Sequence, residues 1–323
     1  MGADELRVVA TIKPVHSLVA AVMEGLGTPA LLVDGQASPH SFALRPSDAK
    51  ALNEADVVFR ISGALEPFTV KIAEALPKSV TLVDLEAADG VSLLETRTGT
   101  TFEAHDHAEK AGAKNDHDHD KDHAKGNGKK TTAKDHDHDE DDHDHDRDHA
   151  AGGNDGHIWL DPENAKAIVR RAANVLAARK PELKERLQAN AAKAIADIDA
   201  LDAELKAALA PAKGRPFVVF HDAYQYFERR YGLQAAGAIT LNPEVKPSAR
   251  RLRDIRAKLA RVDAACVFAE PQFPPKIIDT VIEGTKAKSG TLDPLGSTIA
   301  AGAGQYGALM RALAEAMTGC LAR

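Results

Sequence analysis

Short runs of apolar, often β-branched residues alternate along most of the chain with stretches whose apolar residues recur every three or four positions. In the first part of the chain these runs predict strands at residues 6–12, 30–34, 56–61 and 80–85. The stretches between them predict helices at residues 14–25, 47–53 and 66–75. Strands that alternate with helices indicate the α/β class, with a mostly parallel sheet that helices cover on both faces.

A second set of the same kind follows residue 210. It predicts strands at residues 217–221, 236–240, 265–269 and 290–292. It also predicts helices at residues 222–230, 248–262, 274–286 and 304–321. Asp222 and Ser248 are suitable N-cap residues for the first two of these helices.

Two more helices are predicted between the sets. Asp161 is a suitable N-cap and Pro162 suits the first helical position, so one helix should run to about Arg179. The other, at residues 182–209, would span ~40 Å at ~1.5 Å per residue. It could simply be a long surface helix, but its place between the two sets favours a rigid connector. We therefore expect two lobes joined by a long helix, with boundaries at 1–180, 181–210 and 211–323.

The pattern breaks down between about residues 91 and 156, where Asp, His, Lys and Gly dominate. Ten of the fourteen histidines lie in this insertion: His105, His107, His117, His119, His123, His136, His138, His143, His145 and His149. Residues 105–150 carry 13 Asp and 2 Glu against 7 Lys and 1 Arg, which accounts for the whole net charge of −7. The rest of the chain is balanced and gives no electrostatic reason to expect nucleic acid or anionic lipid as a partner. An insertion with so few large apolar residues should be disordered without metal.

The ends of the chain and the cysteines bear on its compartment. No apolar run approaches the ~18–20 residues that span a bilayer. The first five residues lead straight into a predicted strand, which is typical of a mature secreted domain, although a cytosolic protein could begin in the same way. Cys266 and Cys320 could be two free buried thiols, but in an exported protein a disulfide is favoured. It would join a strand to the C-terminal helix across 54 residues.

The four histidines outside the insertion lie in ordinary globular sequence. His40 lies in a loop between a strand and a helix, His157 has apolar neighbours, and His221 ends a predicted strand. Ligands of open α/β sheets bind beyond the carboxyl ends of strands, so these three are candidate metal ligands. Asp293 also follows a strand and is a candidate fourth ligand, unless it is simply a turn aspartate before proline. His16 lies one turn into the first helix, where we expect a structural role.

Three neutral imidazoles with a carboxylate or a water molecule make a four-coordinate site that suits Zn²⁺. A set so rich in nitrogen argues against Mg²⁺ and Ca²⁺, which prefer oxygen ligands. Cu²⁺ and Ni²⁺ accept similar donors, so the ligand types alone do not separate zinc from these ions.

Four motifs in this order resemble the zinc-binding solute-binding proteins of ABC transporters, the ZnuA-like members of the cluster A-I metal receptors. They are residues 38–48 (SPHSFALRPSD), 157–162 (HIWLDP), 220–224 (FHDAY) and 291–296 (TLDPLG). The resemblance covers essentially the whole chain and includes an acidic, His-rich insertion between the first two motifs.

The resemblance implies two α/β lobes joined by a long helix, with zinc held in the cleft between them by His40, His157 and His221. Manganese-binding relatives have a glutamate where His221 stands, so this residue favours zinc. Some zinc-binding relatives have a glutamate directly before the first histidine. Here that position is Pro39, so the fourth ligand could be Asp293 or water. Cys266 and Cys320 match the disulfide of the zinc-type members.

The function that the resemblance implies is high-affinity zinc binding in the periplasm and delivery of Zn²⁺ to a membrane ABC permease driven by its ATPase. We expect a monomer that does not span the membrane, with a periplasmic zinc chaperone as a further candidate partner. The ten histidines of the insertion could be auxiliary low-affinity zinc ligands, part of a zinc sensor, a docking element or a solvated acidic segment.

Two other functions compete with the receptor. A zinc storage or chaperone protein would use the insertion as its main site. A zinc hydrolase could use three histidines with an open fourth position, but the chain has no His-Glu-x-x-His helix that would supply a general base. A continuous helix between the lobes leads us to expect only modest closure on metal binding.

Overall fold

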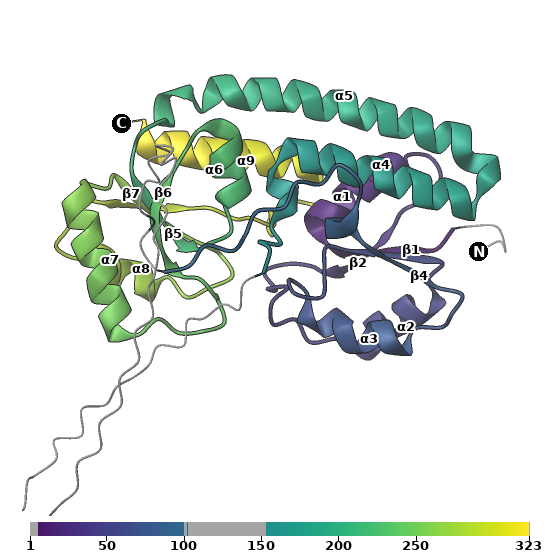
Figure 1. The fold of residues 1–323 in the computed structure, drawn as a ribbon, viewed down its shortest axis with the longest axis horizontal. Helices are drawn as coiled ribbons and strands as arrows, with labels where there is room; N and C mark the ends of the chain where they lie inside the picture. Colours follow the sequence, from purple (N-terminus) through teal and green to yellow (C-terminus); the bar gives the residue numbers. More distant parts are fainter. Residues whose placement is uncertain (1–5, 100–101, 103–152, 323) are drawn as a thin grey trace, which may run out of the picture. The chain divides into compact units, whose positions relative to one another are not determined.

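The first half of the molecule is built on a four-stranded parallel sheet with the strand order β2-β1-β3-β4. Its strands are β1 (Val8–Ile12), β2 (Ala30–Val33), β3 (Val57–Arg60) and β4 (Thr81–Asp84). Every residue of β1 and β3 is buried. This is what continuous apolar runs produce in a parallel sheet covered on both faces. The computed structural model describes residues 6–99, 102 and 153–322 (Figure 1).

The second half repeats the arrangement with the strand order β6-β5-β7-β8, again parallel. Its strands are β5 (Phe217–His221), β6 (Ala235–Thr240), β7 (Cys266–Ala269) and β8 (Lys288–Thr291). All eight predicted strands are therefore confirmed, with ends that shift by a few residues. In each sheet the order reverses at the central strand, β1 or β5. This reversal creates the crevice at the carboxyl ends where ligands bind in such folds.

Helices cover both sheets. In the first half they are α1 (Lys13–Val22), α2 (Pro46–Glu54), η1 (Pro67–Thr69), α3 (Val70–Ala75), η2 (Leu85–Ala87), η3 (Ile158–Leu160) and α4 (Pro162–Arg179). The chain then forms η4 (Pro181–Leu183), α5 (Lys184–Ala208) and η5 (Ala210–Ala212). The second half adds α6 (Gln225–Tyr231), α7 (Ala249–Val262), α8 (Lys276–Ile282) and α9 (Gln305–Leu321). Asp161 and Ser248 cap α4 and α7 as predicted, since their side chains accept from the Glu163 and Arg251 amides.

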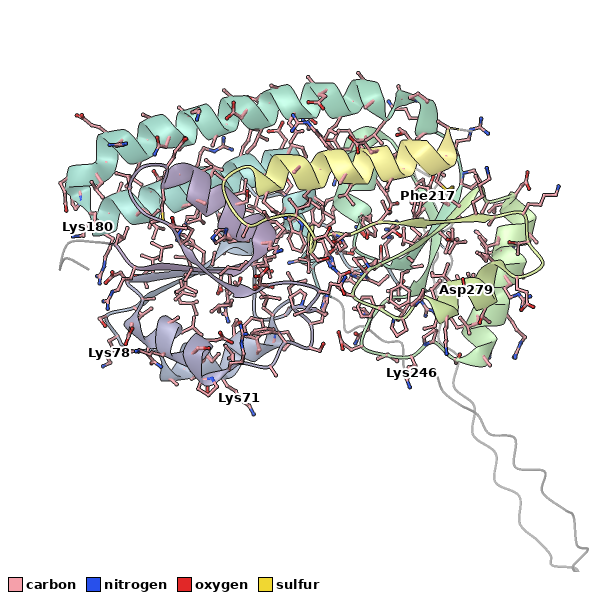
Figure 2. All side chains as sticks on the ribbon, turned by 180° about the vertical axis from the view of Figure 1, so that it is seen from behind. Lys71, Lys78, Lys180, Phe217, Lys246 and Asp279 are labelled. Carbon is pink, nitrogen blue, oxygen red and sulfur yellow. A yellow bond between two sulfur atoms is a disulfide. The ribbon has the colours of Figure 1, made fainter. Side chains whose placement is uncertain are left out.

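The long helix α5 lies against α1, α4 and α9 (Figure 1). Its buried residues recur every three or four positions: Leu187, Ala191, Ala194, Ile198, Leu201, Asp202 and Leu205. Seen from behind, α5 and α9 run beside each other, and Phe217 marks the start of β5 (Figure 2). The predicted helix is confirmed, while its role as a rigid connector between lobes stays a prediction. Within the described ranges no helix combines the length and the apolar character needed to cross a bilayer.

Cys266 of β7 and Cys320 of α9 form a disulfide, which confirms the pairing expected from the resemblance. The bond joins the second sheet to the C-terminal helix. Cys266 is fully buried.

Two sequence predictions are wrong. Asp222 does not cap a helix, because α6 begins three residues later and the Asp222 carboxylate pairs with Arg97 instead. The range predicted to be disordered, about residues 91–156, is too wide at both ends. Residues 91–99, 102 and 153–156 are held by hydrogen bonds to the second half and to one another. The predicted disorder of the middle of the insertion, with its ten histidines, falls outside the described residues.

Candidate metal centre

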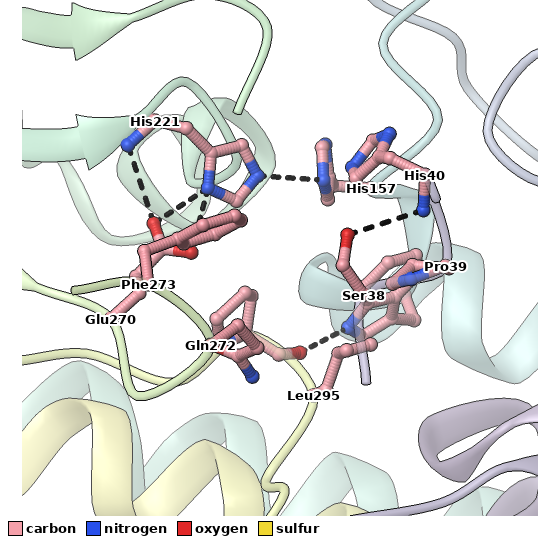
Figure 3. A pocket seen from close by; sticks show the side chains of 11 residues that line it. Ser38, Pro39, His40, His157, His221, Glu270, Gln272, Phe273 and Leu295 are labelled. Atoms are coloured by element: carbon pink, nitrogen blue, oxygen red, sulfur yellow. Dashed lines mark hydrogen bonds and ion pairs between the residues drawn. The ribbon is translucent and has the colours of Figure 1, made fainter. Parts of the chain in front are cut away.

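Three histidines from separate parts of the chain meet between the two halves. His40 lies in the loop between β2 and α2, His157 directly precedes η3, and His221 is the last residue of β5. One ligand nitrogen from each lies within 4.8 Å of the others. The ring centroids are 5.2–5.8 Å apart (Figure 3). The structure thus brings together three of the four predicted ligands.

Two carboxylates fix the direction of two of these rings. Nδ1 of His157 lies 2.7 Å from Oδ1 of Asp155, and Nδ1 of His221 lies 2.6 Å from Oε1 of Glu270. The Nε2 atoms of the two rings consequently face each other at 3.3 Å. A carboxylate on one ring nitrogen holds the proton there and leaves the lone pair of the other nitrogen for a metal.

His157 reaches its position because the chain around it packs closely. A Cβ on Gly156 would lie 2.9 Å from Cβ of Leu65, so this approach requires glycine. Two residues later, Nε1 of Trp159 donates to the carbonyl of Pro294 at 2.8 Å. Trp159 is fully buried and its ring lies 5.4 Å from that of His157. The tryptophan therefore fixes the ligand loop against the segment that follows β8.

The surroundings shift the pKa values of two of the imidazoles in opposite directions. Burial, together with the neighbouring His157 and His221 rings, holds the pKa of His40 well below its ordinary value. His40 is therefore neutral and ready to bind a cation at neutral pH. Burial also lowers the pKa of His221, but the Glu270 carboxylate, together with Asp222 and Asp155, raises it, and the net shift is upward. Glu270 thus makes His221 the more basic ligand.

The space between the histidines is small. The cavity has a volume of about 10 Å³ and is lined by Ser38, Pro39, Trp159, Gln272, Phe273, Pro294 and Leu295 besides the histidines and Glu270. About one water molecule fits such a volume. Sites for organic ligands are typically ~300–1,000 Å³. The site therefore suits a single ion better than an organic substrate.

The other predicted residues lie elsewhere. Asp293 follows β8 by two residues, and its carboxylate accepts from the Gln272 amide, the Leu295 and Ser297 backbone amides and the Ser297 hydroxyl. Among the described residues, the group of converging ligand atoms contains the three histidines and not Asp293. Nε2 of His16 lies 2.9 Å from the carbonyl oxygen of Pro29, in keeping with a structural role. The ten histidines of the insertion are outside the described ranges.

Asp155 and Glu270 are the functional residues that the sequence did not reveal. Glu270 directly follows β7, the neighbour of β5, so the rule that ligands bind at the carboxyl ends of central strands could have found it. Asp155 gave no comparable signal, since it lies within the stretch that composition predicted to be disordered.

Comparison with known proteins places this geometry in a family. The family model described as "Zinc-uptake complex component A periplasmic" matches residues 8–320. The High-affinity zinc uptake system protein ZnuA of Brucella suis biovar 1 (strain 1330) is 44% identical over 316 residues, covering 98% of this chain and 92% of that protein. The protein of the same name from Paracoccus denitrificans (strain Pd 1222) is 44% identical over 323 residues, with coverages of 99% and 93%.

Solved structures share the fold. A crystal structure of ZnuA has a TM-score of 0.73 at 23% identity, and the match covers 98% of this chain and all of that one. The periplasmic zinc-binding protein TroA of Treponema pallidum has a TM-score of 0.73 at 19% identity, with coverages of 99% and 100%. Because the family model and the relatives match nearly the whole chain, the chain belongs to the family of periplasmic zinc-uptake complex components A.

Proposed function

We propose that this protein is a high-affinity zinc receptor that binds one Zn²⁺ ion with His40, His157 and His221. The observation that carries the proposal is the convergence of three imidazole nitrogens within 4.8 Å in a cavity of about 10 Å³. The names of the relatives support zinc as the ion and uptake as the process. The ion is cargo and is not chemically changed.

The same family membership supports the partners. The receptor acts in the periplasm and delivers zinc to an ABC permease of the inner membrane, which an ATPase drives. We propose that it works as a monomer, and that a periplasmic zinc chaperone can load it.

The insertion, with its alternating histidines and aspartates, acts as an auxiliary zinc-binding element of lower affinity. Its imidazoles bind metal only when neutral, so this binding is lost near pH 6.

A water molecule or Asp293 completes the coordination. The four hydrogen bonds that Asp293 accepts favour water, since the carboxylate would have to exchange some of them to reach the ion. Replacing Asp293 by Asn separates the alternatives. A water-completed site keeps its affinity, whereas loss of a negatively charged carboxylate ligand lowers it clearly.

The first test is calorimetric titration of zinc into the intact chain and into a variant that lacks residues 105–150. We expect one tight site in both proteins and additional weaker sites only in the intact chain. A tight site that disappears with the insertion would instead indicate a storage or chaperone protein.

The second test removes the ligands one at a time. His157→Ala and His221→Ala should abolish tight binding, while His16→Ala, which changes a buried histidine outside the site, should retain it. Hydrolysis of activated esters by the zinc-loaded protein, lost in the same two variants, would support the zinc hydrolase and contradict the receptor.

A further inference from the structure

The two ends of the insertion form a defined structure on the folded part of the chain. We call this structure the stem, consisting of residues 91–99, 102 and 153–156. Its two segments run antiparallel and pair through a bridge between Glu95 and Asn154. The Thr96 amide donates to the carbonyl of Gly153 at 2.8 Å, and the Asp155 amide donates to the carbonyl of Leu94 at 2.8 Å. The stem is thus a two-stranded connection that includes Asp155.

Arg97 fixes the stem to the second half. Its guanidinium donates to both carboxylate oxygens of Asp222 and to both of Glu228, at 2.8–3.1 Å for the contacts other than the short one between Nη2 and Oδ1 of Asp222. The side chains of Arg97, Asp222 and Glu228 are 19%, 4% and 5% exposed. The Phe102 ring centroid lies 3.9 Å from Cζ of Arg97. A buried fork that joins two carboxylates is a geometry that arginine alone provides.

One of the two carboxylates lies directly beside the proposed metal site, and the other holds the neighbouring helix. Asp222 directly follows the ligand His221. Glu228 lies in α6 and accepts from the Ala235 amide at the start of β6. Arg97 therefore joins the end of β5, α6 and the stem at one point. It does not touch the cavity itself.

Tyr226 links the same helix to the second ligand. Its hydroxyl accepts from the Leu94 amide at 3.0 Å and donates to the Asp155 carbonyl at 2.8 Å. The Asp155 carboxylate in turn accepts from the His157 amide at 2.9 Å and lies against its Nδ1. The stem thus connects Arg97 to the carboxylate that orients His157, while Asp222 connects it to His221.

From these contacts we propose that Arg97 is a positioning residue for the zinc site, which keeps the facing Nε2 atoms of His157 and His221 in place by tying the stem to the end of β5. The inference rests on the proposed zinc function. It adds that the stem, which connects the insertion to the folded part of the chain, helps to hold the zinc-binding histidines in place. A deletion confined to residues 105–150 leaves this support intact, whereas a change in the stem does not.

The test compares two arginines of similar side-chain exposure, each of which pairs with two carboxylates. Arg97→Lys keeps the charge, but a single ammonium nitrogen with three donors cannot make the five contacts by which the guanidinium reaches both oxygens of each carboxylate. Arg230→Lys is the control, because Arg230 is 21% exposed and also pairs with two carboxylates, Asp202 and Glu163, which lie in α5 and α4 and belong neither to the stem nor to the end of β5. Zinc affinity is measured by competition with a chelator. The visible spectrum of the Co²⁺-loaded protein reports the coordination geometry.

Substitution of groups that orient metal ligands typically lowers affinity by about 10–100-fold. Arg97 acts through one further residue, so Arg97→Lys should lower zinc affinity by about 10-fold and change the Co²⁺ spectrum. Arg230→Lys should leave both within about twofold. Tyr226→Phe, which removes only the hydroxyl between Leu94 and Asp155, should act in the same direction as Arg97→Lys and carries the test if that variant does not fold.

The inference is overturned if Arg97→Lys and Tyr226→Phe bind zinc like the unchanged protein with the same Co²⁺ spectrum. Equal losses in Arg97→Lys and Arg230→Lys would overturn it too, since they would reflect general destabilisation. An unchanged protein without a tight zinc site would overturn the proposed function as well, so the two failures are distinguishable.

Discussion

At the scale of single residues, two carboxylates lie behind the histidines of the proposed zinc site. Asp155 and Glu270 are 6% and 3% exposed, and each lies against the Nδ1 atom of a ligand histidine. A buried carboxylate is costly unless it is paired or hydrogen bonded. Both carboxylates are paired with a histidine, and the same contact leaves Nε2 of that imidazole facing the other ring. One hydrogen bond therefore offsets the cost of burying the carboxylate and also fixes the orientation of the imidazole.

Glu270→Gln tests this coupling. The amide keeps the size of the side chain but no longer increases the basicity of His221 or firmly holds its proton at Nδ1. We expect zinc affinity to fall by about 10–100-fold at pH 7.5, measured by chelator competition. Glu204→Gln is the control, because Glu204 pairs with Arg311 on the surface and should leave affinity unchanged. Equal affinities for Glu270→Gln and the unchanged protein would contradict the role given to this carboxylate.

Glu66 should make the free energy of unfolding depend on pH, whether or not metal is bound. The side chain is fully buried, and although its Oε2 accepts from the Ile61 and Ser62 amides, burial raises its pKa to about 7. The folded state therefore favours the protonated carboxyl. Its contribution to stability is fully present below the ordinary pKa of a glutamate and is lost as pH rises through about 7.

Glu66→Gln should remove this dependence. Between pH 4.5 and pH 8 the unchanged protein should lose about 3 kcal/mol more of its free energy of unfolding than the variant. Urea unfolding of both proteins, stripped of metal with a chelator, measures the difference. Parallel stability curves over this pH range would show that Glu66 is charged in the folded state at neutral pH.

At the scale of elements, the sequence was informative where a residue's role depends on local periodicity. All strands and the long helix could be predicted from apolar spacing. His40 and His221 could be predicted as candidate ligands from their place after strands, and His157 from its apolar neighbours. The errors concern contacts between distant residues. Asp222 has the composition and position of a helix cap, but Arg97, 125 residues earlier in the chain, takes its carboxylate.

The stem is a second case in which contacts between distant residues could not be predicted from the sequence. Composition predicted disorder from about residue 91, because the polar residues there offer little apolar surface to bury. A few specific contacts suffice to order its two ends: the buried ion pairs of Arg97, the ring of Phe102 and the hydroxyl of Tyr226. The partners of Arg97 and Leu94 lie on α6 and directly after β5, more than 100 residues away in the chain, so these contacts could not be read from the local sequence.

The disulfide joins two elements, β7 and α9, whose cysteines are separated by 54 residues. Closing a loop of this length restricts the unfolded chain, and its loss typically lowers stability by about 3–4 kcal/mol. We expect the Cys266→Ser, Cys320→Ser double variant to unfold at a correspondingly lower urea concentration. The unchanged protein treated with a thiol reductant should unfold like the variant. Unfolding midpoints that do not differ would show that the helix is held without the bond.

At the scale of the whole folded unit, the two sheets have the same strand order and present the carboxyl ends of their strands to one site. Contacts outside the cavity also hold these halves together. Nζ of Lys13, directly after β1, donates to the Ser297 and Ile299 carbonyls at 2.7 and 3.0 Å. Ser17 of α1 contacts the start of α9 through the Tyr306 amide. Helix α5 packs against α1 and α9 together. These contacts oppose a large rotation of one half against the other.

We therefore predict that zinc binding changes the distance between the halves by less than the ~2 Å that marks a rearrangement. Lys78 and Asp279 are exposed and lie in the first and second halves (Figure 2), so spin labels on cysteines at these positions report the separation. The distance distribution should stay single and nearly unchanged when zinc is added.

A shift of many ångströms, or a second population that zinc removes, would contradict the prediction. It would mean that these buried contacts and α5 allow a hinge. If the separation stays constant, we expect metal release to begin with local movement at the site, where His40 is the least buried of the three histidines.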